Sequence, residues 1–227
     1  MFLSRRATQA EYFDWPDRPP VEIAGFHRSL ARVNRCFVFA EPFQRLLPKL
    51  LGNQHCSPLS LLDLGAGNGS LGSQLAIWAA KRGWEWRFTN LDVNLPALRL
   101  AGTGRNVAAS ALALPFRDAS FDIVIASQMT HHLNDEEVRR HLREAWRVAR
   151  AAVFITDLHR NAALYLLLWL LLHLRRYPEH FRHDGLLSVR RGFRVRELQA
   201  LADAAGWPAA RVRLYFGARV ILHVRKC

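Results

Sequence analysis

Residues 60–72 read SLLDLGAGNGSLG and combine an apolar run, a glycine-rich turn and the start of an amphipathic segment. Apolar residues then recur at helical spacing as far as Lys81, so the stretch predicts a strand, a turn and a helix. Three alternating glycines let the backbone turn tightly and let a ligand lie against bare main chain. Because the N–H groups that open the helix would face that ligand, the context favours a nucleotide-type ligand over a plain turn.

The glycine pattern differs from the dinucleotide fingerprint, which has glycine or alanine at its sixth position. Ser70 stands there in this chain, and the third glycine, Gly69, comes one residue early. Asp63, just before the turn, adds an acidic group that can hold a cationic amine. The pattern therefore indicates a ligand other than NAD. A dehydrogenase with a basic surface is the remaining alternative.

Composition indicates one folded domain with a basic surface. The chain has 227 residues, 50% of them hydrophobic, which is enough for a sizeable core and excludes a disordered protein. The formal net charge of +13 permits contact with RNA, anionic lipid or an acidic substrate. A simpler explanation is an arginine-biased composition that coats the surface.

The cysteines and the N-terminus bear on the cellular compartment. Cys36, Cys56 and Cys227 are few, odd in number and without C-x-x-C spacing, which argues against a disulfide framework or a zinc site. The first fifteen residues contain no long apolar core, so no signal peptide is predicted. Both observations fit a cytoplasmic protein.

From Leu59 onward, strand-like and helix-like segments alternate, which predicts a parallel sheet covered on both faces. Strands are predicted near 60–64, 86–91, 106–110, 122–127 and 152–157, and helices near 71–82, 95–101 and 134–149. Two strand-like runs at 211–216 and 219–225 are joined by a short turn, so they are predicted to form an antiparallel hairpin.

The segments outside this alternation carry separate predictions. Residues 1–20 are predicted to be an irregular lead-in, residues 21–51 two helices, residues 52–58 a loop and residues 195–205 a last helix. The run AALYLLLWLLLHL at 162–174 is too short to span a bilayer. As a helix it must be buried, line a pocket for a hydrophobic acceptor, or contact another subunit or lipid. The arginine-rich segment RHDGLLSVRRGF at 182–193 is predicted to be a loop.

Polar residues follow several predicted strands, and ligands bind at the carboxyl ends of strands in doubly wound sheets. Asp92 follows the second strand, where a carboxylate can accept two hydrogen bonds from a ribose diol or can cap a helix. His131 and His132 follow the fourth strand and can act as a general base or orient a substrate hydroxyl. Asp157 and His159 follow the fifth strand and are expected to face the same cleft. No H-x-x-x-H or H-E-x-x-H spacing occurs here, so no metal site is predicted.

These motifs resemble the class I S-adenosylmethionine-dependent methyltransferases. The run DLGAGNG at 63–69 is similar to motif I of that family, D-L-G-x-G-x-G. The run ASALALPF at 109–116 is similar to the family segment G-D-A-x-x-L-P-F, with Ser110 in place of the aspartate that receives the adenine amino group. The resemblance covers residues 59–160 and is to the small-molecule branch (methyltransferase type 11 or 25), which includes the ubiquinone and menaquinone biosynthesis enzymes.

The resemblance implies an α/β fold with a Rossmann-like, doubly wound, mostly parallel seven-stranded sheet that ends in an antiparallel hairpin. It implies one domain over 1–227, with an N-terminal helical lid (1–52), a cofactor-binding core (59–160) and a substrate-side helix, loop and terminal hairpin (161–227). S-adenosyl-L-methionine is the implied cofactor, and the residues expected to bind it are Asp63, Gly65, Ala66, Gly67, Gly69, Asp92, Val93, Ser110, Ala111 and Ser127. The candidate catalytic residues are His131, His132, Asp157 and His183.

The implied reaction is methyl transfer from the sulfonium to an oxygen, or alternatively a carbon, of a small, aromatic and hydrophobic acceptor. RNA methylation is a second interpretation, prompted by the charge. However, the chain lacks an N/D-P-P-Y/F run after the fourth strand, a Pro-Cys nucleophile and an RNA-binding module, so nucleic acid is not expected as a partner. A catalytically silent cofactor-binding protein is the third interpretation. Residues 162–174 could also support a homodimer or a peripheral membrane contact.

Overall fold

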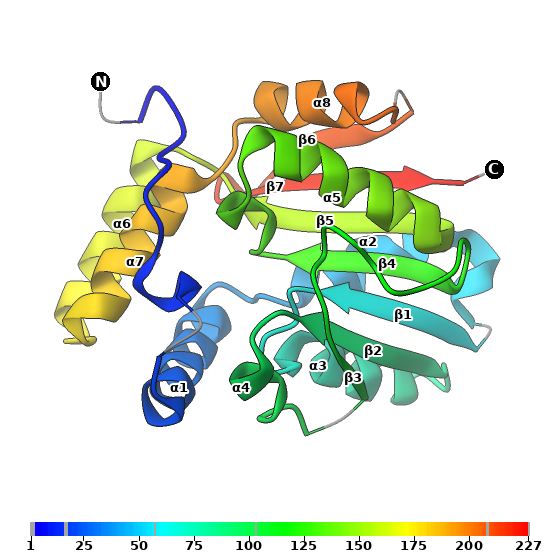
Figure 1. Cartoon of the computed structure of the whole chain (residues 1–227), viewed down its shortest axis with the longest axis horizontal. Coiled ribbons are helices and arrows are strands. Elements are labelled where there is room, and N and C mark those ends of the chain that lie inside the picture. Colours follow the sequence, from blue (N-terminus) through cyan, green and yellow to red (C-terminus); the bar gives the residue numbers. More distant parts are fainter. Residues whose placement is uncertain (1–2, 16–17, 57, 103, 208, 227) are drawn as a thin grey trace.

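The computed structural model describes residues 3–15, 18–56, 58–102, 104–207 and 209–226. Pro16 of the predicted lead-in and Cys227 of the cysteine set lie outside the described residues. In the described part of the chain, seven strands form one sheet in the order β3-β2-β1-β4-β5-β7-β6 (Figure 1). The predicted α/β fold with a mostly parallel seven-stranded sheet is confirmed.

The strands lie close to their predicted positions. They are β1 (Leu59–Leu64), β2 (Trp86–Asp92), β3 (Arg105–Ala108), β4 (Phe121–Ser127), β5 (Ala149–Leu158), β6 (Arg211–Tyr215) and β7 (Arg219–Arg225). The first five pair in parallel, whereas β7 runs antiparallel to both β5 and β6. The predicted hairpin is therefore present, and it closes one edge of the sheet.

Alternation along the strands divides the core into two layers. Leu61 and Leu62 are neighbours on β1, so they point to opposite faces, and both are fully buried. Leu61 packs in the same cluster as residues of α2 and α3, and Leu62 packs in the cluster of α5 and α8. These helices are α2 (Glu41–Leu51), α3 (Ser70–Ala80), α5 (Asp135–Val148) and α8 (Val195–Ala204). Because both faces are covered, as Figure 1 shows, β1 is an almost continuous apolar run.

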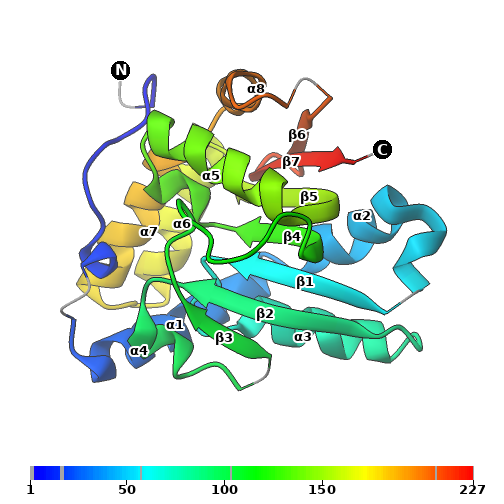
Figure 2. The same cartoon turned by 45° about the vertical axis from the view of Figure 1, so that its right-hand side comes forward.

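Three further helices gather at the carboxyl ends of the parallel strands, on the left in Figure 1. They are α1 (Pro20–Cys36), α6 (Ala162–Leu174) and α7 (Glu179–Arg191). Val33 of α1, Leu168 of α6 and Phe181 of α7 are buried in one shared cluster. Figure 2 shows the short helix α4 (Leu95–Leu98) beside α1 at this end of the sheet. The helices of this cluster therefore stand where strand order reverses between β1 and β4, which is where doubly wound sheets bind ligands.

The segment 182–193, predicted to be a loop, lies mostly in helix α7, and that prediction is wrong. The helix begins after Pro178 at its N-cap and buries Phe181, Leu187 and Val189. Gly185, which suggested a loop, lies where α6 comes close, since a Cβ at that position would be 3.1 Å from Cδ1 of Leu172. The many arginines obscure the apolar period of the helix, so composition alone did not indicate it. The predicted loop at 52–58 likewise contains a 3₁₀ helix at Gly52–Cys56.

The N-terminal strap, residues 3–15, runs along α7 toward α1 and is drawn in dark blue in Figure 1. It contains a single 3₁₀ turn, Tyr12–Asp14, and is otherwise irregular, as predicted. The backbone N–H groups of Tyr12 and Phe13 donate to the buried Asp184 carboxylate at 2.9 and 3.2 Å. Hydrogen bonds to α7 therefore hold a segment that has no regular structure of its own.

Helix α6 buries one stripe and exposes the other. Leu164, Leu168 and Leu172 are buried, whereas Trp169 is 44% and Leu166 62% exposed. No helix in the part of the chain that the structure describes combines the length and the hydropathy needed to cross a bilayer.

Candidate active site

A cavity of about 540 Å³ opens at the carboxyl ends of β1, β2 and β4. Nine of the ten residues predicted to bind the cofactor line it: Asp63, Gly65, Ala66, Gly67, Asp92, Val93, Ser110, Ala111 and Ser127. Gly69 does not line it. A Cβ at Gly69 would lie 2.9 Å from Asn90 and 3.0 Å from Ala101, so this glycine serves packing at the start of α3.

The glycine loop is held open by its backbone conformation and by Asp92. Gly65 and Gly67 have φ angles of +67° and +55°, which L side chains rarely adopt. A Cβ at Gly67 would lie 2.9 Å from Cε1 of His27, which reaches down from α1. The Asp92 carboxylate accepts hydrogen bonds from the N–H groups of Gly67 (2.7 Å) and Asn94 (2.8 Å). Asp92 therefore shapes the loop while also facing the cavity.

Asp63 is a buried carboxyl group at the edge of the cavity, with 2% of its surface exposed. Burial, and then the charge of Asp92, raise the pKa of Asp63 to about 8. Its Oδ2 has no hydrogen-bond partner among the described residues. Because buried polar atoms are normally paired, this oxygen fits a ligand that brings a donor or a positive charge.

Replacing Asp63 by asparagine is expected to make the stability of the ligand-free protein depend less on pH. Its pKa is raised above the unfolded value of about 3.9, so the folded state holds one extra proton between about pH 4 and about pH 8. Stability falls as pH rises through that window, by at most about 1.4 kcal/mol per pH unit. Thermal melts from pH 5 to 9 should show a steeper fall in Tm for wild type than for Asp63→Asn, and parallel curves would contradict the assignment.

The two predicted serines line the cavity with their hydroxyls already paired within the protein. Ser110 stands where the resembled family has an aspartate, and its Oγ accepts a hydrogen bond from the N–H of Leu112 at 3.1 Å. The hydroxyls of Ser127 and Thr156 are 2.8 Å apart at the ends of β4 and β5. Each serine oxygen keeps a further lone pair with which to accept a ligand hydrogen bond.

His131 lies just after β4, fully enclosed beside Asp157. Its Nδ1 is 2.6 Å from Oδ1 of Asp157, and its backbone N–H donates to Oδ2 of the same carboxylate at 2.9 Å. Burial alone would lower the pKa of His131, but Asp157 and then Glu11 outweigh burial and raise it to about 9. Asp157 was expected to face the cleft, yet it is fully buried behind His131. It therefore acts on the cavity only through that imidazole.

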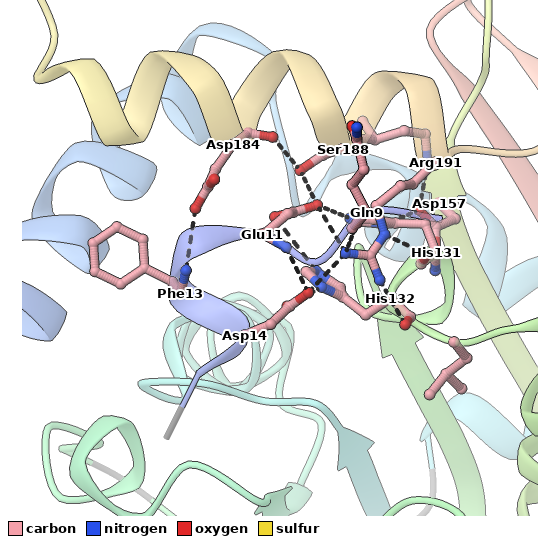
Figure 3. A network of polar contacts seen from close by, with 12 residues as sticks. Gln9, Glu11, Phe13, Asp14, His131, His132, Asp157, Asp184, Ser188 and Arg191 are labelled. Atoms are coloured by element: carbon pink, nitrogen blue, oxygen red, sulfur yellow. Dashed lines mark hydrogen bonds and ion pairs between the residues drawn. The ribbon is translucent and has the colours of Figure 1, made fainter. Parts of the chain in front are cut away.

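The N-terminal strap adds two carboxylates that the sequence did not single out. Oε1 of Glu11 lies 3.6 Å from Nε2 of His131, and Oε2 lies 4.0 Å from Nε2 of His132. Oδ1 of Asp14 lies 2.5 Å from Nδ1 of His132, as Figure 3 shows. Burial opposes ionisation of Asp14, but the contact with His132 holds the pKa of that carboxyl well below its usual range. These residues meet at one wall of the cavity.

Arg191, at the last turn of α7, fastens the strap to the loop after β4. Its guanidinium donates to the backbone oxygens of His131 (3.2 Å), His132 (2.6 Å) and Gln9 (3.1 Å). It also donates to the Asp14 carboxylate at 2.7 Å (Figure 3). The sequence shows Arg191 only as one of many arginines, because its partners are 59 to 182 positions away.

Two predicted residues lie elsewhere. His183 was expected to close over the acceptor, but its side chain is 64% exposed on α7 and pairs with Asp184 at 3.2 Å, outside the cavity. His159 was expected to share a cleft with Asp157, but its Nδ1 lies 3.0 Å from the backbone oxygen of Gly217 in the hairpin turn. His183 is on an exposed part of α7, and His159 lies beyond the end of β5 against the hairpin turn, so neither lines the cavity.

A smaller apolar cavity of about 80 Å³ adjoins the large one. Both are lined by Glu11, Phe26, Leu30, Asn34, Gln128 and Ser188. Its inner wall is made by Leu164, Leu168 and Leu172 of α6 and by Phe181 of α7. The buried stripe of α6 thus lines an apolar compartment next to the polar wall.

Comparisons with known proteins agree on the fold. Residues 62–155 match the model of a methyltransferase domain family. A candidate O-methyltransferase from Nostoc punctiforme is 18% identical with a TM-score of 0.63; the match covers 99% of this chain and 65% of that one. Magnesium protoporphyrin IX methyltransferase from Synechocystis, solved with bound S-adenosylmethionine, is 12% identical with a TM-score of 0.52 and coverage of 83% and 80%.

A third structure, an S-adenosylmethionine-dependent methyltransferase from Aquifex aeolicus, is 16% identical with a TM-score of 0.57 and coverage of 92% of this chain and 99% of that one. A search of curated protein sequences found no match. The chain spans 65% of the length of the Nostoc protein. Residues 62–155 match a methyltransferase domain family, and the chain shares the fold of these solved methyltransferases.

Proposed function

We propose that the chain uses S-adenosylmethionine to methylate an oxygen of a small, hydrophobic and aromatic acceptor. The observation that carries this proposal is one continuous lining, in which a glycine loop with Asp63 and Asp92 leads to an apolar compartment against α6. A cavity of about 540 Å³ lies within the usual range for small-molecule sites. The donor supplies a methyl group that is already electrophilic, so the protein has to bind, align and exclude water.

Each polar part of the cofactor has a proposed partner among these residues. The unpaired oxygen of Asp63 would hold the ammonium of the methionine part, and Asp92 would accept the ribose hydroxyls. Ser110 would accept from the adenine amino group as a neutral oxygen. The bare main chain at Gly65 and Gly67 leaves room for the ligand to lie against the loop.

The acceptor oxygen is proposed to lie beside Glu11, His131 and His132. The predicted roles of the two histidines, as base or as groups that orient the hydroxyl, remain proposals. In the absence of a bound cation, the raised pKa of His131 supports an orienting role, because a protonated imidazole donates a hydrogen bond and accepts no proton. Small-molecule biosynthesis in a reducing cytoplasm is part of this proposal and rests on the free cysteines Cys36 and Cys56.

The test is turnover of S-adenosylmethionine with phenols of increasing apolar size, followed by mass spectrometry of the products. A methyl ether is the expected product, with kcat/KM rising as the acceptor fills the apolar compartment. Methylation of RNA without turnover of any phenol would support the RNA interpretation instead. Binding of S-adenosylhomocysteine without turnover of either would support a silent binding protein.

Asp92→Ala is expected to weaken S-adenosylhomocysteine binding by about 1.5–3 kcal/mol, roughly 10- to 150-fold. It removes an anionic acceptor for the ribose hydroxyls and frees the N–H of Gly67 that holds the loop. Asp92→Asn should lose less, since an amide oxygen can still accept. Isothermal titration measures both variants, and wild-type affinity in each would remove Asp92 from the site.

The exposed face of α6 is proposed to contact a second copy of the chain or a lipid surface, because Trp169 and Leu170 are 44% and 47% exposed there. Trp169→Glu is expected to keep the Tm within about 2 °C of wild type and to abolish dimerisation or vesicle binding. Sedimentation velocity measures dimerisation, and vesicle flotation measures lipid binding. If the wild-type protein is a monomer and does not bind vesicles, both versions of the proposal are contradicted.

A further inference from the structure

Two imidazoles and one carboxylate converge at the strap-side wall of the cavity. One donor atom from each of Glu11, His131 and His132 lies within 4.8 Å of the others. The rings of the two histidines lie with centroids 4.2 Å apart and planes tilted by 33°. All three residues line the large cavity, so the space in front of them is open to a ligand.

Each imidazole is oriented by a carboxylate on its far side. Nδ1 of His131 meets Asp157 at 2.6 Å, and Nδ1 of His132 meets Asp14 at 2.5 Å (Figure 3). A carboxylate at Nδ1 takes the N–H of the neutral ring, which leaves the lone pair on Nε2. Nε2 of His131 is buried and has no hydrogen-bond partner among the described residues. This arrangement is the one in which a carboxylate supports a metal-ligating histidine.

The local charge also suits a divalent cation. Glu11, Asp14 and Asp157 contribute three negative charges, and Arg191 contributes one positive charge close to Glu11 and Asp14. With both imidazoles neutral, these four side chains sum to two negative charges. Glu11 and Asp157 are buried and Asp14 is exposed, while the nearby Arg6 is paired with Asp135. Balancing the two negative charges with two protons would place two imidazolium rings with their centroids only 4.2 Å apart. One divalent ion balances the group without that repulsion.

We propose that Glu11, His131 and His132 bind a divalent transition-metal ion, with Zn²⁺ as the best match. Two nitrogens and one oxygen suit zinc, and three protein ligands leave a position open toward the cavity. Tetrahedral zinc at about 2.0–2.2 Å from each ligand needs donor atoms about 3.3 Å apart. The Nε2–Oε distances of 3.6 and 4.0 Å involve different oxygens of Glu11, and the three donor atoms lie within 4.8 Å of one another, so they have to approach by up to about 1.5 Å.

The sequence alone argues against this site because it lacks the usual spacing of metal-binding histidines. Adjacent histidines form it here because both lie in one 3₁₀ turn, Thr130–His132, and because the strap supplies Glu11 from 120 positions away. If the proposed function holds, the open position would take the acceptor oxygen. A bound metal lowers the pKa of such a hydroxyl, and the histidines then act as ligands and not as bases.

The experiment measures Zn²⁺ alone, by isothermal titration and by thermal shift, on the full chain without S-adenosylmethionine or acceptor. Wild type is expected to bind one equivalent that His132→Gln and Glu11→Gln lose or bind at least 100-fold more weakly. Binding to the folded state should also raise the Tm of wild type but not that of His132→Gln or Glu11→Gln. Mg²⁺, which prefers oxygen ligands, should give no shift.

His183→Gln is the matched control, since His183 is an exposed histidine outside the cavity, and it should bind Zn²⁺ as wild type does. His132 is the better residue to replace, because His131 is enclosed. A Tm of metal-free His132→Gln equal to that of metal-free wild type would show that the variant is folded. Equal Zn²⁺ binding by wild type, His132→Gln and Glu11→Gln would overturn the proposal, as would no binding at all. Either result leaves methyl transfer itself untouched, because neither cofactor nor acceptor enters the assay.

Discussion

Gly67→Val is expected to abolish S-adenosylmethionine binding, with an affinity loss of more than about 100-fold. Gly67 has a φ of +55°, a conformation that a β-branched residue essentially never adopts. A Cβ there would also lie 2.9 Å from Cε1 of His27, so either the loop or helix α1 must shift. A shift of the loop would also break the hydrogen bond from the backbone N–H of residue 67 to Asp92, which is the residue proposed to hold the ribose.

The matched control is Gly83→Val. Gly83 also has a positive φ, +74°, but a Cβ there would meet nothing within 4 Å, and Gly83 does not line the cavity. Both variants should therefore lose stability from backbone strain, by about 1–2 kcal/mol. Only Gly67→Val should lose heat of binding in a titration with S-adenosylhomocysteine. Equal affinity in the two variants would show that the ligand does not lie against this loop.

Arg191→Ala is expected to destabilise the protein by about 3–5 kcal/mol, because it removes the buried partner of a carboxylate and of three backbone oxygens. A loss of this size corresponds to a fall in Tm of about 6–20 °C for a chain of this length. The strap should detach from the loop after β4, since Arg191 holds both. Turnover should therefore fall well below wild type even at temperatures where the variant stays folded.

Two further variants make the Arg191 prediction specific. Arg196→Ala removes an exposed arginine from the next helix and should leave the Tm within about 1 °C of wild type. Arg191→Lys keeps the charge but loses the planar set of donors, so it should behave more like alanine than like arginine. Limited proteolysis of residues 3–15 reports the strap directly. An uncleaved strap in Arg191→Ala would contradict the role assigned to this side chain.

The elements of the sheet could be predicted because their signals are local. Strand β1, the turn at Gly65 and Gly67, and helix α3 follow one another along the chain, and each is determined by the pattern of its own few residues. Asp63 and Asp92 could be placed at the cavity for the same reason, because the carboxyl ends of parallel strands meet at one edge of the sheet. Helix α7 was missed because arginines obscured its apolar period.

The sequence by itself determined the α/β fold, the terminal hairpin and the residues around the glycine loop. Only the tertiary structure decided the opposite wall, where Glu11 and Asp14 of the strap meet the two histidines after β4. No short-range pattern links those residues, since the strap has no regular structure and is positioned by hydrogen bonds to Asp184 and Arg191. The carboxylates of Asp157 and Glu11, which raise the pKa of His131 against the effect of burial, reach it only once these distant segments have packed together.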